Sequence, residues 1–279
     1  MSSIWCNGEW LAADRYPGAA QDRGAFLGLG LFETMAAIDG KVLFAERHLA
    51  RLRESGARLG WEIEMPELMQ VARELLERES LAVGRARLRL IVTAGSGPHN
   101  DLTPGTDRLV WLAAFAGSES PLSVTACLSP WPRNERSPLA GMKTACYAEN
   151  LIALDDARKR GFDEAVFLNT SGQLCESATA NLFLIKDGVL RTPSLDSGCL
   201  PGIGREVLCE LAVDHGFTLE EKPLLLDDLQ TADEIFLSSA TRGPFAVSRM
   251  DGRNLFIHPR TDRLRECWEV EVERQRHDA

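Results

Sequence analysis

The chain has 279 residues, of which 31 are lysine or arginine and 41 are aspartate or glutamate, so its formal net charge is -10. This acidic balance argues against a general nucleic-acid binder and against a protein held on anionic membranes by charge alone. The length suits one large or two medium domains, and 44% of the residues are hydrophobic. We therefore expect a folded protein that binds neither nucleic acid nor membrane.

The cation and cysteine counts narrow the chemistry further. Only five of the 31 cations are lysines, which leaves 26 arginines, so lysine chemistry has few candidates. The seven cysteines are odd in number and are never spaced as C-x-x-C, which disfavours a disulfide framework and a zinc knuckle. The N-terminus lacks a basic stretch followed by an apolar run, and no segment approaches the ~20 apolar residues that span a bilayer. The cytoplasm is the expected location.

The first half of the chain alternates strand and helix patterns. A short strand ends at a turn of Asn7 and Gly8, and later the dipeptide Asp39-Gly40 predicts a hairpin. Apolar residues recur with helical spacing in two segments, the second of which begins at Pro66. We predict strands over 31–38, 41–44, 87–93 and 109–115, helices over 46–59 and 66–78, and a long loop of turn residues between the last two strands.

The second half follows a candidate linker at 116–121. Strands are predicted over 122–128, 164–169, 180–185, 234–238 and 246–250, and helices over 148–160, 202–215 and 259–275. Because strands outnumber helices and hairpin turns recur, we predict an α+β fold with mixed or antiparallel sheets. The predicted domains are a smaller N-terminal one, 1–118, and a larger C-terminal one, 119–279.

Lys143 is the candidate nucleophile. It lies among small and apolar neighbours, whereas the other four lysines lie beside hairpin turns or other charges. A lysine in an apolar setting can lose its proton and react as an amine, although an isolated lysine is more often a surface residue at a strand end. Glu176 lies in a small polar run between two predicted strands, where it could accept a hydrogen bond from a cationic ring nitrogen. A solvated turn carboxylate is the equally plain alternative.

Three further features could hold an anion. The run Leu200-Pro201-Gly202-Ile203-Gly204-Arg205 opens a helix, whose free N–H groups attract phosphate, although such a run is often only a turn. Ser238 to Thr241 follow a strand and offer hydroxyl and N–H groups. Arg51 lies on a predicted helix face, where arginine is usually solvated. Together these residues offer an amine that can react with an aldehyde, a carboxylate that can bind a ring nitrogen, and a site for phosphate. Pyridoxal 5'-phosphate (PLP) has all three of the matching groups.

Several segments resemble the class IV, or fold type IV, PLP-dependent aminotransferase family in order and spacing. That family includes branched-chain and D-amino-acid aminotransferases and 4-amino-4-deoxychorismate lyase. The likeness spans almost the whole chain, and the lysine and glutamate segments are the specific ones. The segments are DRGAFLGLGLFET (22–34), ERHLARL (46–52), MKTACYAENLIALDDARKRGFDEAVFLN (142–169), CESATANLFLI (175–185), LPGIGREVL (200–208) and DEIFLSSATRGPFAV (233–247).

The resemblance implies a role for each candidate residue. Lys143 matches the lysine that forms the Schiff base, Glu176 the carboxylate at the pyridine nitrogen, and Arg51 the phosphate-binding arginine. The rest of the phosphate site falls on Ile203, Gly204, Ser239, Ala240 and Thr241. Gly204 departs from the family pattern, because many relatives carry threonine there. The resemblance also implies two domains with the cofactor in the cleft between them, a small-molecule substrate and a homodimer.

The segments GLFET, KTACYAEN and SATRG resemble the lyase group more closely than the branched-chain enzymes. The predicted function is therefore 4-amino-4-deoxychorismate lyase, which releases pyruvate and 4-aminobenzoate in folate biosynthesis. An aminotransferase for branched-chain amino acids, D-amino acids or amines is the alternative, although the loop at 93–101 lacks the arginine that D-amino-acid aminotransferases use for a carboxylate. A non-catalytic PLP-fold binding protein is a third possibility, but such a protein need not keep Lys143.

Overall fold

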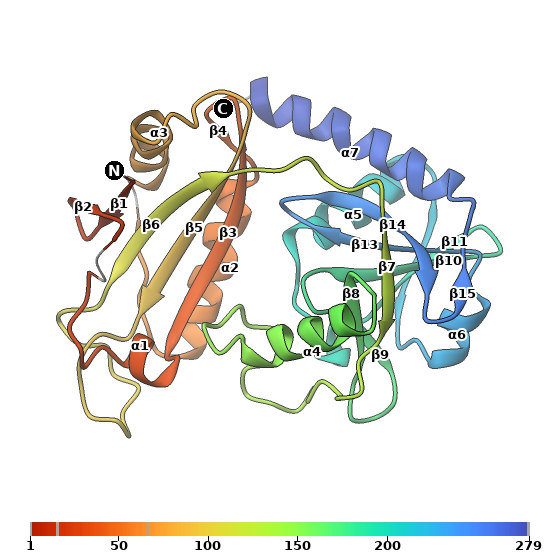
Figure 1. Ribbon diagram of the computed structural model, residues 1–279, viewed down its shortest axis with the longest axis horizontal. Helices are drawn as coiled ribbons and strands as arrows, with labels where there is room; N and C mark the ends of the chain where they lie inside the picture. Colours follow the sequence, from red (N-terminus) through yellow and green to blue (C-terminus); the bar gives the residue numbers. More distant parts are fainter. Residues whose placement is uncertain (1, 15–16, 66, 278–279) are drawn as a thin grey trace. The chain divides into compact units, whose positions relative to one another are not determined.

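The computed structural model describes residues 2–14, 17–65 and 67–277 (Figure 1). The chain forms two compact units. Unit 1 lies within residues 1–119, 142–146 and 273–279, and unit 2 within 120–141 and 147–272. The domain boundary predicted at 118/119 stays a prediction. Nothing in the sequence indicated that segments 142–146 and 273–279 belong to unit 1.

Unit 1 is built on one antiparallel sheet of six strands in the order β2-β1-β6-β5-β3-β4. The predicted hairpin is present, because Asp39 and Gly40 both adopt positive φ, +47° and +78°, between β3 and β4. The strands are β1 (Ser3–Cys6), β2 (Glu9–Ala12), β3 (Gly30–Ile38), β4 (Lys41–Val42), β5 (Arg85–Thr93) and β6 (Val110–Ala116).

Three helices accompany this sheet: α1 (Arg23–Leu27), α2 (Ala45–Arg58) and α3 (Leu68–Arg78). Helix α2 packs on β3 and turns Leu49 and Leu52 into the core, as the helical spacing predicts (Figure 1). The predicted strand over 41–44 is too long. It stops at Val42, because Phe44 takes a left-handed conformation (φ +53°) and caps α2. Pro66, the predicted start of the second helix, lies outside the described residues.

Unit 2 contains a mixed sheet of nine strands, which confirms the predicted α+β class. The path runs β12-β11-β10-β13-β14-β7-β8-β9, and β9 pairs back onto β10, so six of the strands form a closed ring; β15 pairs with β14. The strands are β7 (Ser123–Leu128), β8 (Glu164–Leu168), β9 (Leu174–Ser177), β10 (Asn181–Lys186), β11 (Val189–Pro193), β12 (Thr218–Lys222), β13 (Glu234–Ser239), β14 (Gly243–Met250) and β15 (Arg253–Asn254).

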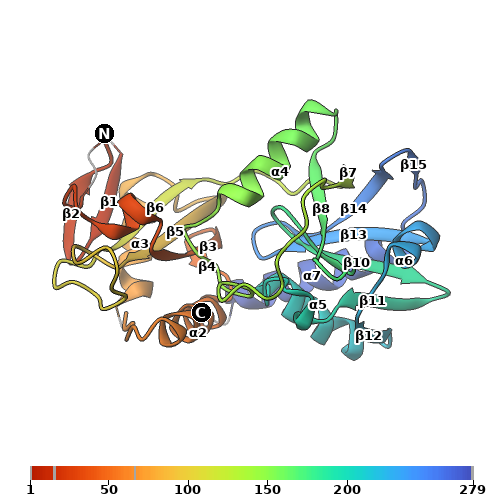
Figure 2. The same ribbon diagram turned by 90° about the horizontal axis from the view of Figure 1, so that it is seen from below.

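The helices of unit 2 cover this sheet. Helix α4 packs against β8, α5 against β12 and β13, and α6 against β10 (Figures 1 and 2). The sheet interior is filled by leucine, isoleucine, valine and phenylalanine side chains that are almost fully buried. The helices are α4 (Ala148–Lys159), the 3₁₀ turn η1 (Leu195–Ser197), α5 (Ile203–Asp214), α6 (Leu226–Thr231) and α7 (Pro259–His277), whose residues from Glu273 onward belong to unit 1.

One difference from the sequence prediction matters for the site. The polar run that begins at Cys175 was expected to connect two strands, but Leu174–Ser177 is itself strand β9. Side chains alternate between the two faces of a strand, so Cys175 enters an apolar cluster while Glu176 faces the other side. Glutamate is depleted in strands, so strand propensity did not predict a strand at these residues.

Candidate functional site

Lys143 lies in a short segment that runs beside the start of β3 in unit 1. The Lys143 carbonyl accepts a hydrogen bond from the Phe32 N–H at 3.0 Å, and the Ala145 N–H donates to the Gly30 carbonyl at 2.8 Å. The Lys143 Nζ stands 4.6 Å from the centre of the Phe32 ring. The side chain is partly buried between buried Met142 and Thr144. The backbone on both sides of Lys143 is therefore fixed, and its ammonium lies against an aromatic ring and near enough to His48 to help lower the pKa of that imidazole.

Arg51 lies on α2 in the same unit and is buried together with two polar partners. Its Nε and Nη2 donate to the Glu33 carboxylate at 2.8 and 2.5 Å, and the His48 Nδ1 lies 2.6 Å from the same carboxylate. Burial alone would raise the pKa of Glu33, but Arg51 and His48 hold it down at about 2. Burial lowers the pKa of His48, so the ring is neutral near pH 7 and its Nδ1 carries the donated proton.

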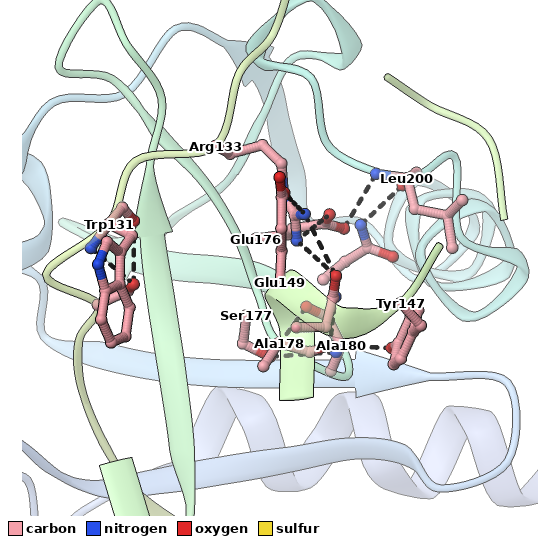
Figure 3. A network of polar contacts seen from close by, with 12 residues as sticks. Trp131, Arg133, Tyr147, Glu149, Glu176, Ser177, Ala178, Ala180 and Leu200 are labelled. Atoms are coloured by element: carbon pink, nitrogen blue, oxygen red, sulfur yellow. Dashed lines mark hydrogen bonds and ion pairs between the residues drawn. The ribbon is translucent and has the colours of Figure 1, made fainter. Parts of the chain in front are cut away.

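Glu176 is buried at the end of β9 in unit 2. One carboxylate oxygen accepts the Leu200 N–H at 2.9 Å, and the other lies 3.5 Å from the Arg133 Nη2 (Figure 3). In the sheet register Glu176 stands opposite Asn181 of β10. The carboxylate is thus held by one backbone donor and one cation, which is a more defined setting than a solvated turn.

The predicted phosphate residues of unit 2 come together at the start of α5. A Cβ added to Gly204 would lie 2.7 Å from the Ser239 carbonyl carbon and 2.9 Å from the Ala240 nitrogen, so this helix start and the turn after β13 nearly touch. Ile203 is the first residue of α5, and its N-cap is Gly202, which has no side chain to cap the helix. Thr241 follows in the same turn, with its hydroxyl 3.5 Å from that of Ser239.

Asn181 connects the glutamate to this helix start. Its Nδ2 donates to the Leu200 carbonyl at 2.8 Å, while the Leu200 N–H donates to Glu176. A Cβ on Gly202 would lie only 1.9 Å from the Asn181 Oδ1, so the amide packs directly against the segment before α5. Residues 200–202 are therefore fixed from both sides.

Tyr147, four residues after Lys143, is the N-cap residue of α4. Its hydroxyl donates to the Ala178 carbonyl at 3.0 Å, and the Asn150 amide donates to the same oxygen at 2.7 Å (Figure 3). The start of α4 therefore orders the turn after Glu176. This contact gives Tyr147 a structural task within unit 2.

The candidate residues fall into two groups. Lys143 and Arg51 belong to unit 1, whereas Glu176, Ile203, Gly204, Ser239, Ala240 and Thr241 belong to unit 2. Sequence reasoning missed Glu33, Arg133 and Asn181, which hold members of these groups. Glu33 and Asn181 lie in the GLFET and SATANLFLI segments, so a carboxylate or amide side chain in a mostly apolar strand was the available signal.

Arg242 is a further residue that sequence reasoning passed over. It comes directly after Thr241, donates to the Thr179 hydroxyl at 2.6 Å and to the Ser239 hydroxyl at 3.3 Å, and lies 3.5 Å from the buried Glu164 carboxylate. Its guanidinium stacks on the Phe245 ring at 4.3 Å. It therefore braces the turn that carries Ser239.

Metal centres and membrane spans are the other kinds of feature that bear on function. Among residues 2–14, 17–65 and 67–277, no group of three or more histidine, cysteine, aspartate or glutamate side chains is placed to hold a metal ion. In the same ranges, no helix has the length and apolar character needed to cross a membrane.

Comparison with known proteins identifies the family. The profile of the family described as "Amino-transferase class IV" matches residues 30–250. A branched-chain-amino-acid aminotransferase from Salmonella typhimurium is 31% identical over 264 residues, which cover 89% of this chain and 85% of the relative.

Two solved structures extend the likeness to the fold. A Legionella pneumophila protein named "Putative 4-amino-4-deoxychorismate lyase" superposes with a TM-score of 0.86 at 29% identity, covering 93% of this chain and 97% of that one. An aminotransferase from Brucella abortus bound to the cofactor PLP has a TM-score of 0.86 at 26% identity, with 97% and 99% coverage. The predicted fold type IV architecture is confirmed. The chain therefore belongs to the class IV aminotransferase family of enzymes.

Proposed function

We propose that this enzyme binds PLP through Lys143, Glu176, Arg51 and the start of α5, and uses it to process a small-molecule amine. The observation that carries the proposal is the close approach of Gly204 to Ser239 and Ala240, which leaves no room for a Cβ and brings the helix start next to that turn. Such a crowded glycine at a helix start, beside a turn with hydroxyl groups, suits a phosphate. The contacts of Glu176 suit the ring nitrogen, and the fixed backbone around Lys143 suits a lysine that binds the aldehyde.

Each residue then has a definable task. When bound, PLP supplies an aldehyde that captures amines and a ring that withdraws electrons from the substrate Cα. Lys143 would hold the cofactor through its Nζ, and the same amine would move a proton to and from the substrate Cα. Glu176 would accept a hydrogen bond from the ring nitrogen. Arg51 would bind a phosphate oxygen, and Glu33 fixes the direction of the Arg51 guanidinium.

Amino-group transfer is the reaction that the comparisons favour. The Salmonella branched-chain-amino-acid aminotransferase shares 31% of its residues with this chain over almost the full length. We therefore place the transfer of an amino group between an amino acid and a keto acid first. This order reverses the preference drawn from the sequence segments, and the lyase activity stays a prediction.

The lyase activity is the second candidate, and two observations support it. The segments GLFET, KTACYAEN and SATRG resemble the lyase group, and the Legionella protein is 29% identical in a structure that this chain covers to 97%. The two reactions share proton removal by Lys143 and differ in the step after it. A lyase expels pyruvate from aminodeoxychorismate and leaves 4-aminobenzoate, the folate precursor.

The covalent role of Lys143 is tested by borohydride reduction of the PLP-loaded protein and then peptide mapping. The label is expected on Lys143 and should be absent from the Lys143→Ala variant. Lys159→Ala is the matched control, because Lys159 is exposed and paired with Asp155 at 2.6 Å, and it should label like the wild type. Bound cofactor with no label on Lys143 would contradict the proposal.

The choice of reaction is tested with three incubations of the same preparation. One contains L-leucine and 2-oxoglutarate, one contains D-alanine and 2-oxoglutarate, and one contains aminodeoxychorismate. We expect glutamate to form in the first. Formation of 4-aminobenzoate in the third, with no amino transfer in the other two, would establish the lyase instead.

We also infer a homodimer that acts in the cytoplasm, in keeping with the sequence expectations. Light scattering should give about twice the chain mass of 30.8 kDa. A mass near 30.8 kDa with full activity would refute the dimer.

A further inference from the structure

Arg133 occupies a central place in the network around Glu176 (Figure 3). Its backbone is fixed, because its N–H donates to the Leu168 carbonyl at 2.8 Å and its own carbonyl accepts the Thr170 N–H at 3.1 Å. Its side chain is only 14% exposed, and its guanidinium lies 4.3 Å from the centre of the Phe167 ring. The side chain of Arg133 is therefore held in one place.

The guanidinium edge is fixed by the first turn of α4. Both Nη1 and Nη2 donate to the Asn150 Oδ1 at 3.2 Å, and Nη1 lies 3.4 Å from the exposed Glu149 carboxylate. The remaining direction of Nη2 is toward the Glu176 carboxylate at 3.5 Å. Asn150 in turn donates to the Ala178 carbonyl, two residues after Glu176. Arg133, Asn150 and the end of β9 therefore form one connected set.

We propose that Arg133 is a positioning residue that keeps the Glu176 carboxylate ionised and aimed at the cofactor ring. The proposal rests on the proposed function, because Glu176 is taken there as the partner of the ring nitrogen. A protonated Glu176 would place a neutral carboxyl group beside the ring nitrogen. The protonated ring nitrogen would then lack a negative charge to stabilise it. The rate of proton removal from Cα would fall with it.

The reason is the balance of charges around a buried carboxylate. Glu176 is 9% exposed, and burial disfavours the charged form of a carboxyl group unless a cation or donors offset it. The neighbouring thiols, those of Cys175 and Cys199, supply no positive charge to offset the burial of Glu176. Burial raises the pKa of Cys199 to about 11 and that of Cys175 further still, so both are neutral at pH 7. Glu149 carries the opposite sign to Arg133 and is 77% exposed, so water screens it.

Arginine suits this position better than lysine for two reasons. A planar guanidinium can stack on Phe167 and donate through two nitrogens to Asn150 at once, whereas an ammonium can do neither in the same geometry. A lysine would still supply the positive charge. Charge and geometry can therefore be separated by substitution.

The first test needs no cofactor. The carboxyl carbon of Glu176, labelled with ¹³C and assigned by its loss in Glu176→Gln, is titrated by NMR in the wild type and in Arg133→Met. Removing the cation should raise the Glu176 pKa by at least about one unit. Arg133→Lys should restore most of the wild-type value. An unchanged pKa in Arg133→Met would overturn the proposal.

The second test uses the PLP-loaded enzyme and its amine substrate. Arg133→Met should lower kcat at least about tenfold while KM changes little, and should shift the pH dependence of the cofactor absorbance; Arg133→Lys should recover most of both. Arg136→Met is the matched control, because Arg136 is 83% exposed in the same segment. If Arg133→Met loses only thermal stability, with kcat and the absorbance profile unmoved, Arg133 is merely structural and the proposal fails. Failure of wild-type Lys143 to take the borohydride label would instead sink the proposed function, whatever the NMR titration gives.

Discussion

The buried pair of Glu33 and Arg51 allows a quantitative prediction. In Glu33→Gln the side-chain volume is kept, but the guanidinium loses the carboxylate charge and one of its two oxygen acceptors, and it stays buried at 8% exposure. Breaking a buried ion pair by removing one partner typically costs about 3–5 kcal/mol. The depressed pKa gives a second estimate: the difference between the ordinary value of 4.5 and about 2, at about 1.4 kcal/mol per pH unit, corresponds to about 3 kcal/mol.

The sign of the pH dependence is set by the direction of the shift. A carboxyl whose pKa is lowered by folding contributes its stability above 4.5, and this contribution is lost as the pH falls from 4.5 toward 2. The difference in the free energy of unfolding between wild type and Glu33→Gln should therefore have its largest value at pH 7. By pH 3.5 it should have narrowed by about 1 kcal/mol.

The assay is urea denaturation monitored by the fluorescence of the buried Trp5 and Trp61 of unit 1. The pH series is run in a His48→Asn background, because the His48 imidazole is a titratable group in contact with Glu33, whereas an asparagine amide does not titrate and can still donate to the carboxylate. Glu54→Gln, at an exposed position of α2, is the control. The reasoning is refuted if Glu33→Gln costs no more than the control at pH 7, or if the difference in the free energy of unfolding stays constant down to pH 3.5.

Three further changes test other parts of the structure. Gly204→Ala places a methyl group 2.7 Å from a backbone carbon, so PLP affinity measured by absorbance titration should fall at least about tenfold, and equal affinity would show that the turn yields freely. The exposed thiol of Cys146 should react with a maleimide in the folded protein, whereas Cys175 should react only after unfolding, as mass spectrometry of the labelled peptides will show. Asn181→Ala leaves the Leu200 carbonyl without its amide donor and should lower the free energy of unfolding by about 1–3 kcal/mol in urea, a change too small to detect being the contrary result.

Much of the fold is encoded in local signals of the sequence. The dipeptides Asp39-Gly40 and Asp187-Gly188 both adopt positive φ at two consecutive residues, because such pairs tolerate the left-handed conformation that tight hairpins need. The long amphipathic helix at 45–58 also lies within a residue of its predicted ends. Strand β9 was missed because its stability comes from pairing with β8 and β10 and not from its own residues.

In the candidate site, too, some residues could be identified from local sequence and others only from the tertiary structure. Lys143 and Glu176 could be singled out from their neighbours in sequence, because a lysine among small residues and a glutamate in a small polar run are unusual locally. Arg133 could not, since its role depends on Phe167, 34 positions later, and on a helix that turns Asn150 toward it. A chain with 26 arginines gives no local reason to prefer one of them.

Gly204 shows how the structure changes the meaning of a sequence feature. In sequence, glycine where many relatives carry threonine indicates a lost hydroxyl contact to phosphate. In the structure, the same position lies so close to Ser239 and Ala240 that a side chain would push the helix start away from the turn. The Leu200 amide, four residues earlier, is committed to Glu176, and its carbonyl to Asn181. The helix start therefore cannot retreat without disturbing the glutamate, so glycine at 204 maintains the spacing between the residues proposed for the phosphate and the residue proposed for the ring.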